Sequence, residues 1–293
     1  MRMDGYMKYY DLSGLANINV ELTNRCNKKC WMCGRRKIET DYPELVLQYG
    51  DMDFGLVKKI AKQLPPHIVV QLHNNGEPLL YPRFGDAVKL FKRQITNIVT
   101  NGKLLVEKAD EIINNLDTLA VSIIENDPEA RQQHAILGRF LKIKGARRPF
   151  TILRLNGMVD QEKYKKFGLI MAKRILHSPM GSFNYKKSEP TVPEIGICLD
   201  FLHHLAINKD GQASICVRFD PKGIGVIGDT KKEPLAKIWN SPKRLQWLKM
   251  HIKGKRRDIP LCSYCHFWGV PTGGAFAGRK NAKINEENIF SRS

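Results

Sequence analysis

Three closely spaced cysteines are the residues of this sequence with the clearest capacity for chemistry. Cys26, Cys30 and Cys33 form a Cx3Cx2C pattern directly after a short apolar run. Thiolates hold iron–sulfur clusters, and a cluster held entirely by the protein takes four of them. Three thiolates can hold three corners of a [4Fe–4S] cube and leave one iron open, and reactions occur at open metal positions. The spacing therefore predicts a reactive cluster.

The other four cysteines form a second group near the C-terminus. Cys262 and Cys265 make a CxxC pair, and a hairpin-turn signal at residues 208–211 brings Cys198 and Cys216 toward each other. Four thiolates match a closed metal site, which holds either zinc or a fully ligated [4Fe–4S] cluster. By spacing alone, zinc is the more common occupant.

The composition sets the environment of these cysteines. The chain has 293 residues, of which 42% are hydrophobic and 26% are charged. No stretch approaches the roughly 18 to 20 apolar residues of a membrane span, and the first residues have no apolar signal-peptide core. We expect a soluble cytoplasmic protein without a membrane partner. Thiols stay reduced in that compartment, so all seven cysteines are expected to bind metal and not to form disulfides.

The net charge of +19 favours anionic partners such as nucleotides, nucleic acid, acidic peptides or phosphorylated sugars. The alternative explanation is solubility in a lysine-rich host. A nucleic-acid-binding protein with structural zinc is the alternative of a different class. That alternative is disfavoured because Cx3Cx2C offers only three ligands and no RRM, KH or helix-turn-helix signature is present. Nucleic acid is therefore not the expected partner.

Strands and helices must alternate to position these residues. Strands are predicted over residues 18–23, 68–72, 95–100, 118–124, 150–155 and 174–177, and helices over residues 54–63, 84–93, 104–115, 128–142 and 161–173. Such alternation is typical of parallel βαβ units, and six units fall short of a closed eight-stranded barrel. We expect an α/β protein with a partial (β/α)6 TIM-like barrel.

The predicted domain organisation has four parts. An N-terminal extension covers residues 1–17, the barrel covers 18–185, a small cysteine-containing domain of a β-hairpin plus helix covers 190–270, and a tail covers 271–293.

Polar side chains gather at one end of the predicted strands. The first cysteine group follows strand one, His73–Pro78 follows strand two, Asn101 follows strand three, Ser122 lies near the end of strand four and Arg154 near the end of strand five. Active sites of such barrels lie at the C-terminal ends of the strands. We therefore expect a single site at this rim.

The Cx3Cx2C loop after strand one and Asn75-Gly76-Glu77-Pro78 after strand two resemble the radical S-adenosylmethionine (SAM) enzymes. The resemblance covers residues 17–180. It implies that Cys26, Cys30 and Cys33 hold a [4Fe–4S] cluster whose open iron binds the amino and carboxylate groups of SAM. An electron, supplied by a flavodoxin or ferredoxin-type donor, then cleaves SAM to a 5′-deoxyadenosyl radical that abstracts hydrogen from a substrate.

The resemblance also implies which residues contact SAM. Met32 holds the position before the third cysteine, which is usually aromatic and packs near the adenine. Glu77 and the backbone around it would accept a charge-assisted hydrogen bond from the ligand's ammonium group. The implied set is Met32, Asn75, Gly76, Glu77, Pro78, Asn101, Ser122 and Arg154. His73, next to this loop, is a candidate proton acceptor.

The second cysteine group resembles the twitch domain, which is the short form of the SPASM extension found on radical SAM enzymes. The resemblance implies an auxiliary [4Fe–4S] cluster, and not zinc, on Cys198, Cys216, Cys262 and Cys265.

The outcome of the reaction and the substrate are inferred from what remains. The two groups use all seven cysteines, so no thiol is left to return hydrogen to a substrate radical. We therefore expect an oxidation or a cross-link, with the auxiliary cluster as electron acceptor. About 17 residues precede strand one, which leaves no room for a module that grips a leader peptide. A small molecule (a sugar, an aminocyclitol or a nucleotide-linked compound) is expected, and a short peptide is the alternative.

Two further features are expected to be peripheral. His203 and His204 either shape the substrate pocket or are partly exposed strand residues, and the second role is expected. Asp127 lies near a possible ligand carboxylate, but a solvated helix face is the expected environment.

Overall fold

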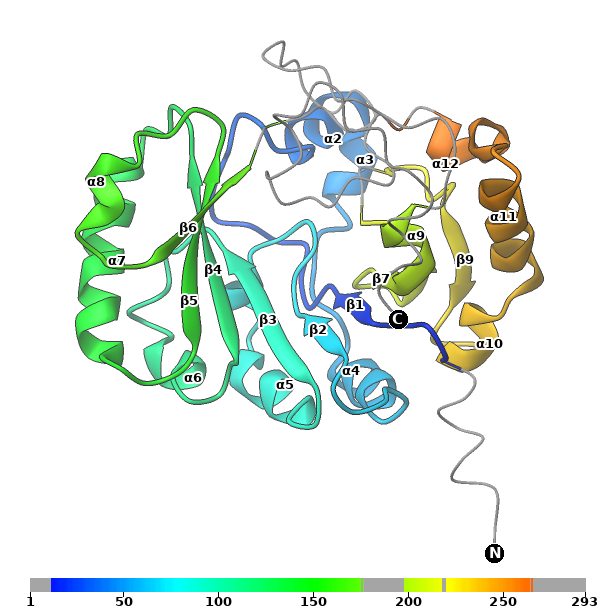
Figure 1. Ribbon diagram of the computed structural model, residues 1–293, viewed down its shortest axis with the longest axis horizontal. Helices are drawn as coiled ribbons and strands as arrows, with labels where there is room; N and C mark the ends of the chain where they lie inside the picture. Colours follow the sequence, from blue (N-terminus) through cyan, green and yellow to red (C-terminus); the bar gives the residue numbers. More distant parts are fainter. Residues whose placement is uncertain (1–11, 175, 177–197, 218–219, 264, 266–293) are drawn as a thin grey trace, which may run out of the picture.

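A nine-stranded sheet runs through the computed structural model, which describes residues 12–174, 176, 198–217, 220–263 and 265 (Figure 1). The strand order is β6-β5-β4-β3-β2-β1-β7-β8-β9. The strands are β1 (Asn17–Val20), β2 (Val69–Gln71), β3 (Ile95–Thr100), β4 (Thr118–Ile124), β5 (Phe150–Asn156), β6 (Ile170–Arg174), β7 (His204–Ile207), β8 (Gln212–Ser214) and β9 (Val226–Asp229). Every neighbouring pair from β6–β5 to β1–β7 is parallel, and the pairs β7–β8 and β8–β9 are antiparallel. The sheet does not close among the described residues, which confirms the predicted partial barrel.

Helices follow most of the strands of the barrel half. They are α2 (Arg35–Asp41), α3 (Pro43–Val46), α4 (Phe54–Ala61), α5 (Phe84–Leu90), α6 (Ala109–Ile112), α7 (Ala130–Lys144) and α8 (Glu162–Lys165). The second half contains α9 (Leu199–His203), α10 (Leu235–Trp239), α11 (Pro242–Ile252) and α12 (Pro260–Ser263). Figure 1 shows α9 to α12 beside β7 to β9, at the opposite end of the sheet from α7 and α8. Within the described residues, no helix has the length and apolar character needed to cross a membrane.

Local sequence explains where helix α4 begins and which side it buries. The side chain of Asp53 accepts a hydrogen bond from the Leu56 amide at 2.9 Å, which caps the first turn. Leu56, Val57 and Ile60 then face the core at helical spacing.

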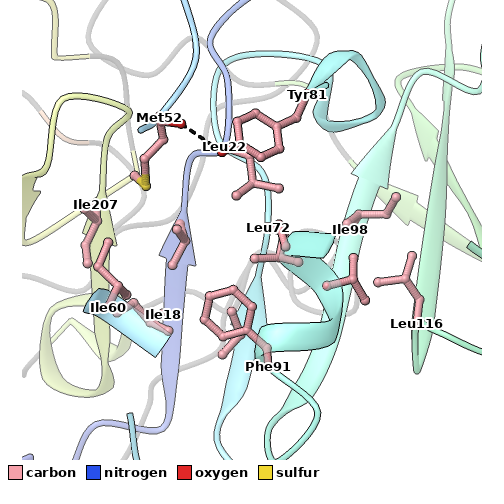
Figure 2. Close-up of a cluster of buried hydrophobic side chains, with 14 of the residues drawn as sticks. Ile18, Leu22, Met52, Ile60, Leu72, Tyr81, Phe91, Ile98, Leu116 and Ile207 are labelled. Atoms are coloured by element: carbon pink, nitrogen blue, oxygen red, sulfur yellow. Dashed lines mark hydrogen bonds between the residues drawn. The ribbon is translucent and has the colours of Figure 1, made fainter. Parts of the chain in front are cut away.

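The core lies between the sheet and the helices of the barrel half (Figure 2) and continues into the C-terminal half, where Leu235 and Trp239 of α10 belong to the same cluster. Ile18 of β1 and Ile98 of β3 are fully buried, as is Phe91 directly after α5. Burying each such side chain contributes about 1.5–3 kcal/mol relative to leaving it exposed. Tyr81 adds a polar tie to this core, because its hydroxyl donates to the carbonyl of Met52 at 2.8 Å.

Two predicted helices are wrong in length. The helix predicted over residues 161–173 ends at Lys165, because Gly168 adopts a left-handed φ of 63° and breaks the helical path. The sixth strand consequently runs over Ile170–Arg174 instead of 174–177, and residues 175 and 177 lie outside the described part. The helix predicted over residues 104–115 is reduced to α6, flanked by turns.

The C-terminal half joins the barrel through a shared sheet. The predicted hairpin is confirmed, with Ala206 opposite Ser214 and Ile207 opposite Ala213. Its first strand, β7, also pairs in parallel with β1, and Asn17 lies opposite His204. Strand β7 thereby covers the edge strand β1 of the barrel, and its first residue, His204, lies beside the barrel interior. The predicted domain limits at residues 185, 190 and 271 lie outside the described residues.

Candidate active site

A cavity of about 430 Å³ opens at the C-terminal ends of the barrel strands and continues into the barrel. That volume is typical of sites for small ligands. Of the residues predicted from the sequence, the cavity is lined by Cys26, Cys30, Met32, Cys33, His73, Asn75, Gly76, Glu77, Asn101, Ser122 and Arg154. Pro78 is buried at the start of the short helix η1 (Pro78–Leu80) and is not part of the lining. The structure thus brings together at one cavity the residues that were predicted from separate strand ends.

A glycine sets how closely two of the site loops approach each other. A Cβ atom on Gly76 would lie 2.2 Å from the carbonyl oxygen of Thr23 and 2.7 Å from that of Arg25. Only glycine fits there, because both contacts are to backbone. The amide of Glu77 then donates to the carbonyl oxygen of Arg25 at 2.8 Å. The loop after β2 is thereby held against the residues that lead into Cys26.

Glu77 joins this loop to the end of β3. Its Oε1 accepts from the Thr100 hydroxyl at 2.7 Å and from the Leu79 amide at 3.2 Å, and its Oε2 accepts from the Asn101 amide at 2.7 Å. Burial raises the pKa of the Glu77 carboxyl to about 7, although these hydrogen bonds act in the opposite direction. The carboxylate therefore joins the loop after β2 to the end of β3. Its remaining lone pairs can accept hydrogen bonds from a ligand.

Asn101 extends this tie to the first cysteine. Its Nδ2 donates to Asn27 Oδ1 at 2.8 Å and lies 3.9 Å from Cys26 Sγ. Gln133 of α7 donates to the carbonyl oxygens of Asn101 and Ser122, at 2.6 and 2.8 Å. Helix α7 thus fixes the ends of β3 and β4 at the cavity.

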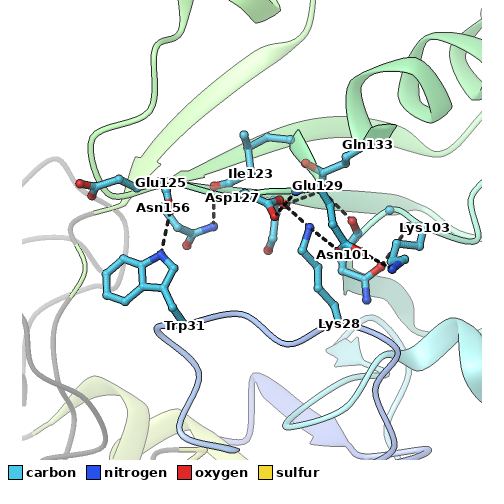
Figure 3. Close-up of polar contacts among 12 residues, drawn as sticks. Lys28, Trp31, Asn101, Lys103, Ile123, Glu125, Asp127, Glu129, Gln133 and Asn156 are labelled. Atoms are coloured by element: carbon cyan, nitrogen blue, oxygen red, sulfur yellow. Dashed lines mark hydrogen bonds and ion pairs between the residues drawn. The ribbon is translucent and has the colours of Figure 1, made fainter. Parts of the chain in front are cut away.

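A buried ion pair clamps the cysteine loop to the connection between β4 and α7 (Figure 3). Lys28 Nζ lies 2.5 Å from Asp127 Oδ2, and each side chain is only 3% exposed. Trp31 Nε1 donates to the Glu125 carbonyl oxygen at 2.8 Å in the same region. The expected solvated environment of Asp127 is therefore wrong: the carboxylate is buried because a lysine of the cysteine loop neutralises it.

The three loop cysteines offer a thiol set that fits a metal cluster. Burial raises the pKa of Cys26, and burial together with the charge of Cys33 raises that of Cys30 to about 12. A bound cationic centre reverses this preference, because it favours thiolates. Within the described residues, no three Cys, His, Asp or Glu side chains form a ready-made site for a single metal ion. A [4Fe–4S] cluster does not need its cysteines to converge on one ion, since each cysteine binds a different iron.

His73 is buried in the cavity wall as a neutral imidazole. Its Nδ1 accepts a hydrogen bond from the Val99 amide at 3.1 Å, which leaves the proton on Nε2. Burial, followed by the charges of Arg154 and Arg174, lowers its pKa to about 3. The ring is therefore suited to donate a hydrogen bond to a ligand and is a weak base at neutral pH.

None of the four cysteines of the second group is among the described residues that line the cavity. Burial and the charges of Cys198 and Cys265 raise the pKa of Cys262 to about 12. Its Sγ lies 3.8 Å from Nε2 of the fully buried His251. The Arg256 guanidinium donates to the carbonyl oxygens of Cys262 and Cys265, at 3.2 and 3.1 Å. The fourth cysteine, Cys216, directly follows the hairpin and packs against the core.

Several polar residues of the barrel interior were missed from the sequence. Asn19 Nδ2 donates to the His73 carbonyl oxygen at 2.6 Å, and its Oδ1 lies 2.7 Å from His204 Nε2. His204 is only 5% exposed and lines the cavity, so the expected partial exposure is wrong for this residue, whereas His203 is exposed. A sequence feature that could have identified these residues is the alternation of Asn17 and Asn19 with apolar residues in β1. Strands of a parallel sheet covered on both faces are usually apolar throughout, so this alternation indicates a hydrated barrel interior.

Comparisons with known proteins agree with this architecture. Residues 20–160 match the Radical SAM superfamily, and residues 198–266 match SPASM, an iron–sulfur cluster-binding domain. A Pyrococcus furiosus protein named tungsten-containing aldehyde ferredoxin oxidoreductase cofactor-modifying protein is 34% identical over 110 residues. That match spans 36% of this chain and only 28% of the relative.

Solved structures share the fold at low sequence identity. BtrN in complex with AdoMet and 2-DOIA superposes with a TM-score of 0.57 at 19% identity, over 86% of this chain and 92% of BtrN. Streptococcus suis SuiB bound to precursor peptide SuiA gives 0.55 at 12% identity, over 89% and 73% of the two chains.

The matches to the two domains confirm the predicted cofactors: SAM with a [4Fe–4S] cluster for the first domain, and further iron–sulfur chemistry for the second. The chain belongs to the radical S-adenosylmethionine superfamily, in the group whose second domain is of the SPASM iron–sulfur type.

Proposed function

We propose that this enzyme cleaves SAM reductively and oxidises a small polar molecule after abstracting hydrogen from one of its C–H bonds. The observation that carries the proposal is the convergence of three thiols, the Asn75–Pro78 loop and the ends of β3 to β5 on one cavity. Separate segments of the chain supply these groups, and the contacts of Gly76 and Glu77 hold them together.

The cysteines hold the two clusters in this proposal. Cys26, Cys30 and Cys33 bind the cluster at the cavity, and its remaining iron is left for SAM. The other four cysteines bind the auxiliary cluster. When bound, the first cluster supplies the electron that cleaves SAM, and the second accepts an electron from the substrate radical.

The cavity walls position SAM. Met32 packs near the adenine, and the backbone of the Asn75–Pro78 loop with Glu77 accepts the ammonium group. Pro78 acts indirectly, by fixing the start of η1. Asn101 and Ser122 face the ribose and carboxylate from the ends of β3 and β4. Arg154 is the one cation in the implied set.

An oxidative outcome follows from the available groups. The substrate gives up a hydrogen atom and then one electron and one proton, for an overall loss of two electrons. Re-reduction of the radical by a thiol would require a cysteine outside the two ligand sets, and the seven cysteines are all assigned. His73 serves as a hydrogen-bond donor to the substrate, because its lowered pKa makes it a weak base.

A small molecule is the favoured substrate because the cavity has the volume of a small-ligand site and polar side chains line it. The BtrN complex and the name of the Pyrococcus relative both refer to small molecules or cofactors, which supports this choice. A short peptide is the alternative, since SuiB shares the fold and was solved with a precursor peptide. The proposed electron donor is a flavodoxin or a ferredoxin.

Anaerobic reconstitution tests the proposal. Purified protein should contain about eight iron atoms per chain, the sum of two [4Fe–4S] clusters. Addition of dithionite and SAM should yield 5′-deoxyadenosine. Formation of product with about four iron atoms would refute the electron-acceptor role of the second site, and zinc without 5′-deoxyadenosine would refute the whole assignment.

A further inference from the structure

Arg154 places a positive charge inside the barrel, and among the described residues no carboxylate pairs with it. The residue lies on β5 between Ser122 of β4 and Ala172 of β6, and its side chain lines the cavity. Burial lowers its pKa, although a guanidinium remains charged at neutral pH. In the part of the chain that the structure describes, no carboxylate forms an ion pair or hydrogen bond with Arg154. A partly buried charge is costly unless it is paired, so this position is built for an anion that comes from outside.

The neighbours of Arg154 increase the attraction for an anion. Arg174 of β6 lines the same cavity, and both guanidinium groups act on His73, which stays neutral. The carboxylates in the lining are Glu77 and Asp200. Glu77 already accepts hydrogen bonds from Thr100 and Asn101, and Asp200 lies on α9.

Arg154 shares the cavity wall with His73 and with Arg174 of the neighbouring strand β6. The cations that act on the thiols of Cys26 and Cys30 are Arg35 and Lys28 respectively, whereas Arg154 acts on His73. SAM is held through its amino and carboxylate groups at the cluster in the proposed function. A substrate anion and the SAM carboxylate share the chemistry that Arg154 binds, and the variants below distinguish the two sources.

We propose that Arg154 binds the anionic group of the substrate, a carboxylate or a phosphate, in this cavity. The inference rests on the proposed function, because it assigns the substrate of that same site. Other polar side chains of the cavity lining, among them His73 and Asn19, suit the hydroxyl or amide groups of a polar substrate body. An anion anchored at Arg154 leaves the remainder of the substrate to extend toward SAM.

Calorimetric titration of the reconstituted, SAM-loaded protein, kept oxidised so that no turnover occurs, tests this subsite. The probes are inorganic phosphate, glucose 6-phosphate and glucose. Wild-type protein should bind glucose 6-phosphate at least tenfold more tightly than glucose. Arg154→Gln should abolish this preference and Arg154→Lys should retain part of it. Arg148→Gln is the matched control: this arginine precedes β5, its side chain is 66% exposed, and it should bind the probes as wild type does.

Three results would overturn the proposal. The first is the absence of any phosphate preference in the wild type, and the second is an unchanged preference in Arg154→Gln. The third is a tenfold weaker SAM affinity in Arg154→Gln with phosphate binding intact, which would assign Arg154 to the SAM carboxylate. A separate measurement tests the proposed function: if it is wrong, reduced wild-type protein with SAM forms no 5′-deoxyadenosine.

Discussion

The two cysteine groups differ in how the chain presents them. Cys26, Cys30 and Cys33 lie on one loop and line a cavity. Of the second group, none is among the described residues that line this cavity, and Cys198 and Cys262 pack against the core. In the proposed function, the first arrangement would expose a metal centre to a ligand, whereas the second would enclose one.

The means of holding each group also differ. The first loop is fixed from outside by side chains of a distant connection, through the pair Lys28–Asp127. In the second group, Cys198 and Cys265 lie close enough to act on the Cys262 thiol, and Arg256 and His251 contact Cys262 directly. The comparison suggests that the barrel keeps its shape without the first cluster, whereas the folding of the second domain depends on its metal.

The largest expected effect comes from removing a ligand at the open site. Cys26→Ala should reduce formation of 5′-deoxyadenosine to background, because the cluster loses one of its three protein ligands. The second cluster should remain, so iron analysis should still find about four atoms per chain. Product formation at the wild-type rate would show that the active-site assignment is wrong.

Removing a ligand at the closed site should instead affect folding. Cys262→Ala should lose about half of the iron, and it should lower the yield of soluble protein because the metal organises this small domain. Iron analysis and the soluble fraction measure both effects, with Cys26→Ala as the comparison variant. Full iron content in Cys262→Ala would contradict the ligand set.

The buried ion pair tests how the first loop is held. Lys28→Met leaves Asp127 as an uncompensated buried charge and should destabilise the protein by about 3–5 kcal/mol. Urea unfolding measures the loss, and the double variant Lys28→Met/Asp127→Asn should recover part of it. Lys37→Met, which breaks the exposed pair with Asp41 on α2, is the control and should leave the unfolding midpoint unchanged. Equal midpoints for Lys28→Met and the wild type would show that the clamp adds no stability.

Local patterns predicted the strands and the cysteine loop well. Strands β3 and β4 have the predicted limits, because turns bound their apolar runs on both sides. What the sequence could not show are pairings between distant segments. Lys28 and Asp127 are 99 residues apart, and neither position has a local pattern that indicates burial. The parallel pairing of β7 with β1 is another such contact, and it is the reason that His204 is buried in the cavity wall.

The smallest expected effect concerns the surroundings of the closed site. His251 Nε2 lies 3.8 Å from Cys262 Sγ, and burial and the charge of Arg256 lower the pKa of the ring to about 4, so at neutral pH the ring is uncharged. In the tautomer with its proton on Nε2, it donates to a Cys262 thiolate. Hydrogen bonds to cluster sulfurs raise the reduction potential. His251→Phe should therefore make the second potential more negative, by on the order of 60 mV if one hydrogen bond of about 1.4 kcal/mol is lost. A redox titration followed by electron paramagnetic resonance measures both clusters in one sample. The first potential should stay constant and serve as the internal control. A shift confined to the first cluster would contradict the assignment of His251 to the closed site, and with it the distinction between a site open to SAM and a site tuned by buried donors.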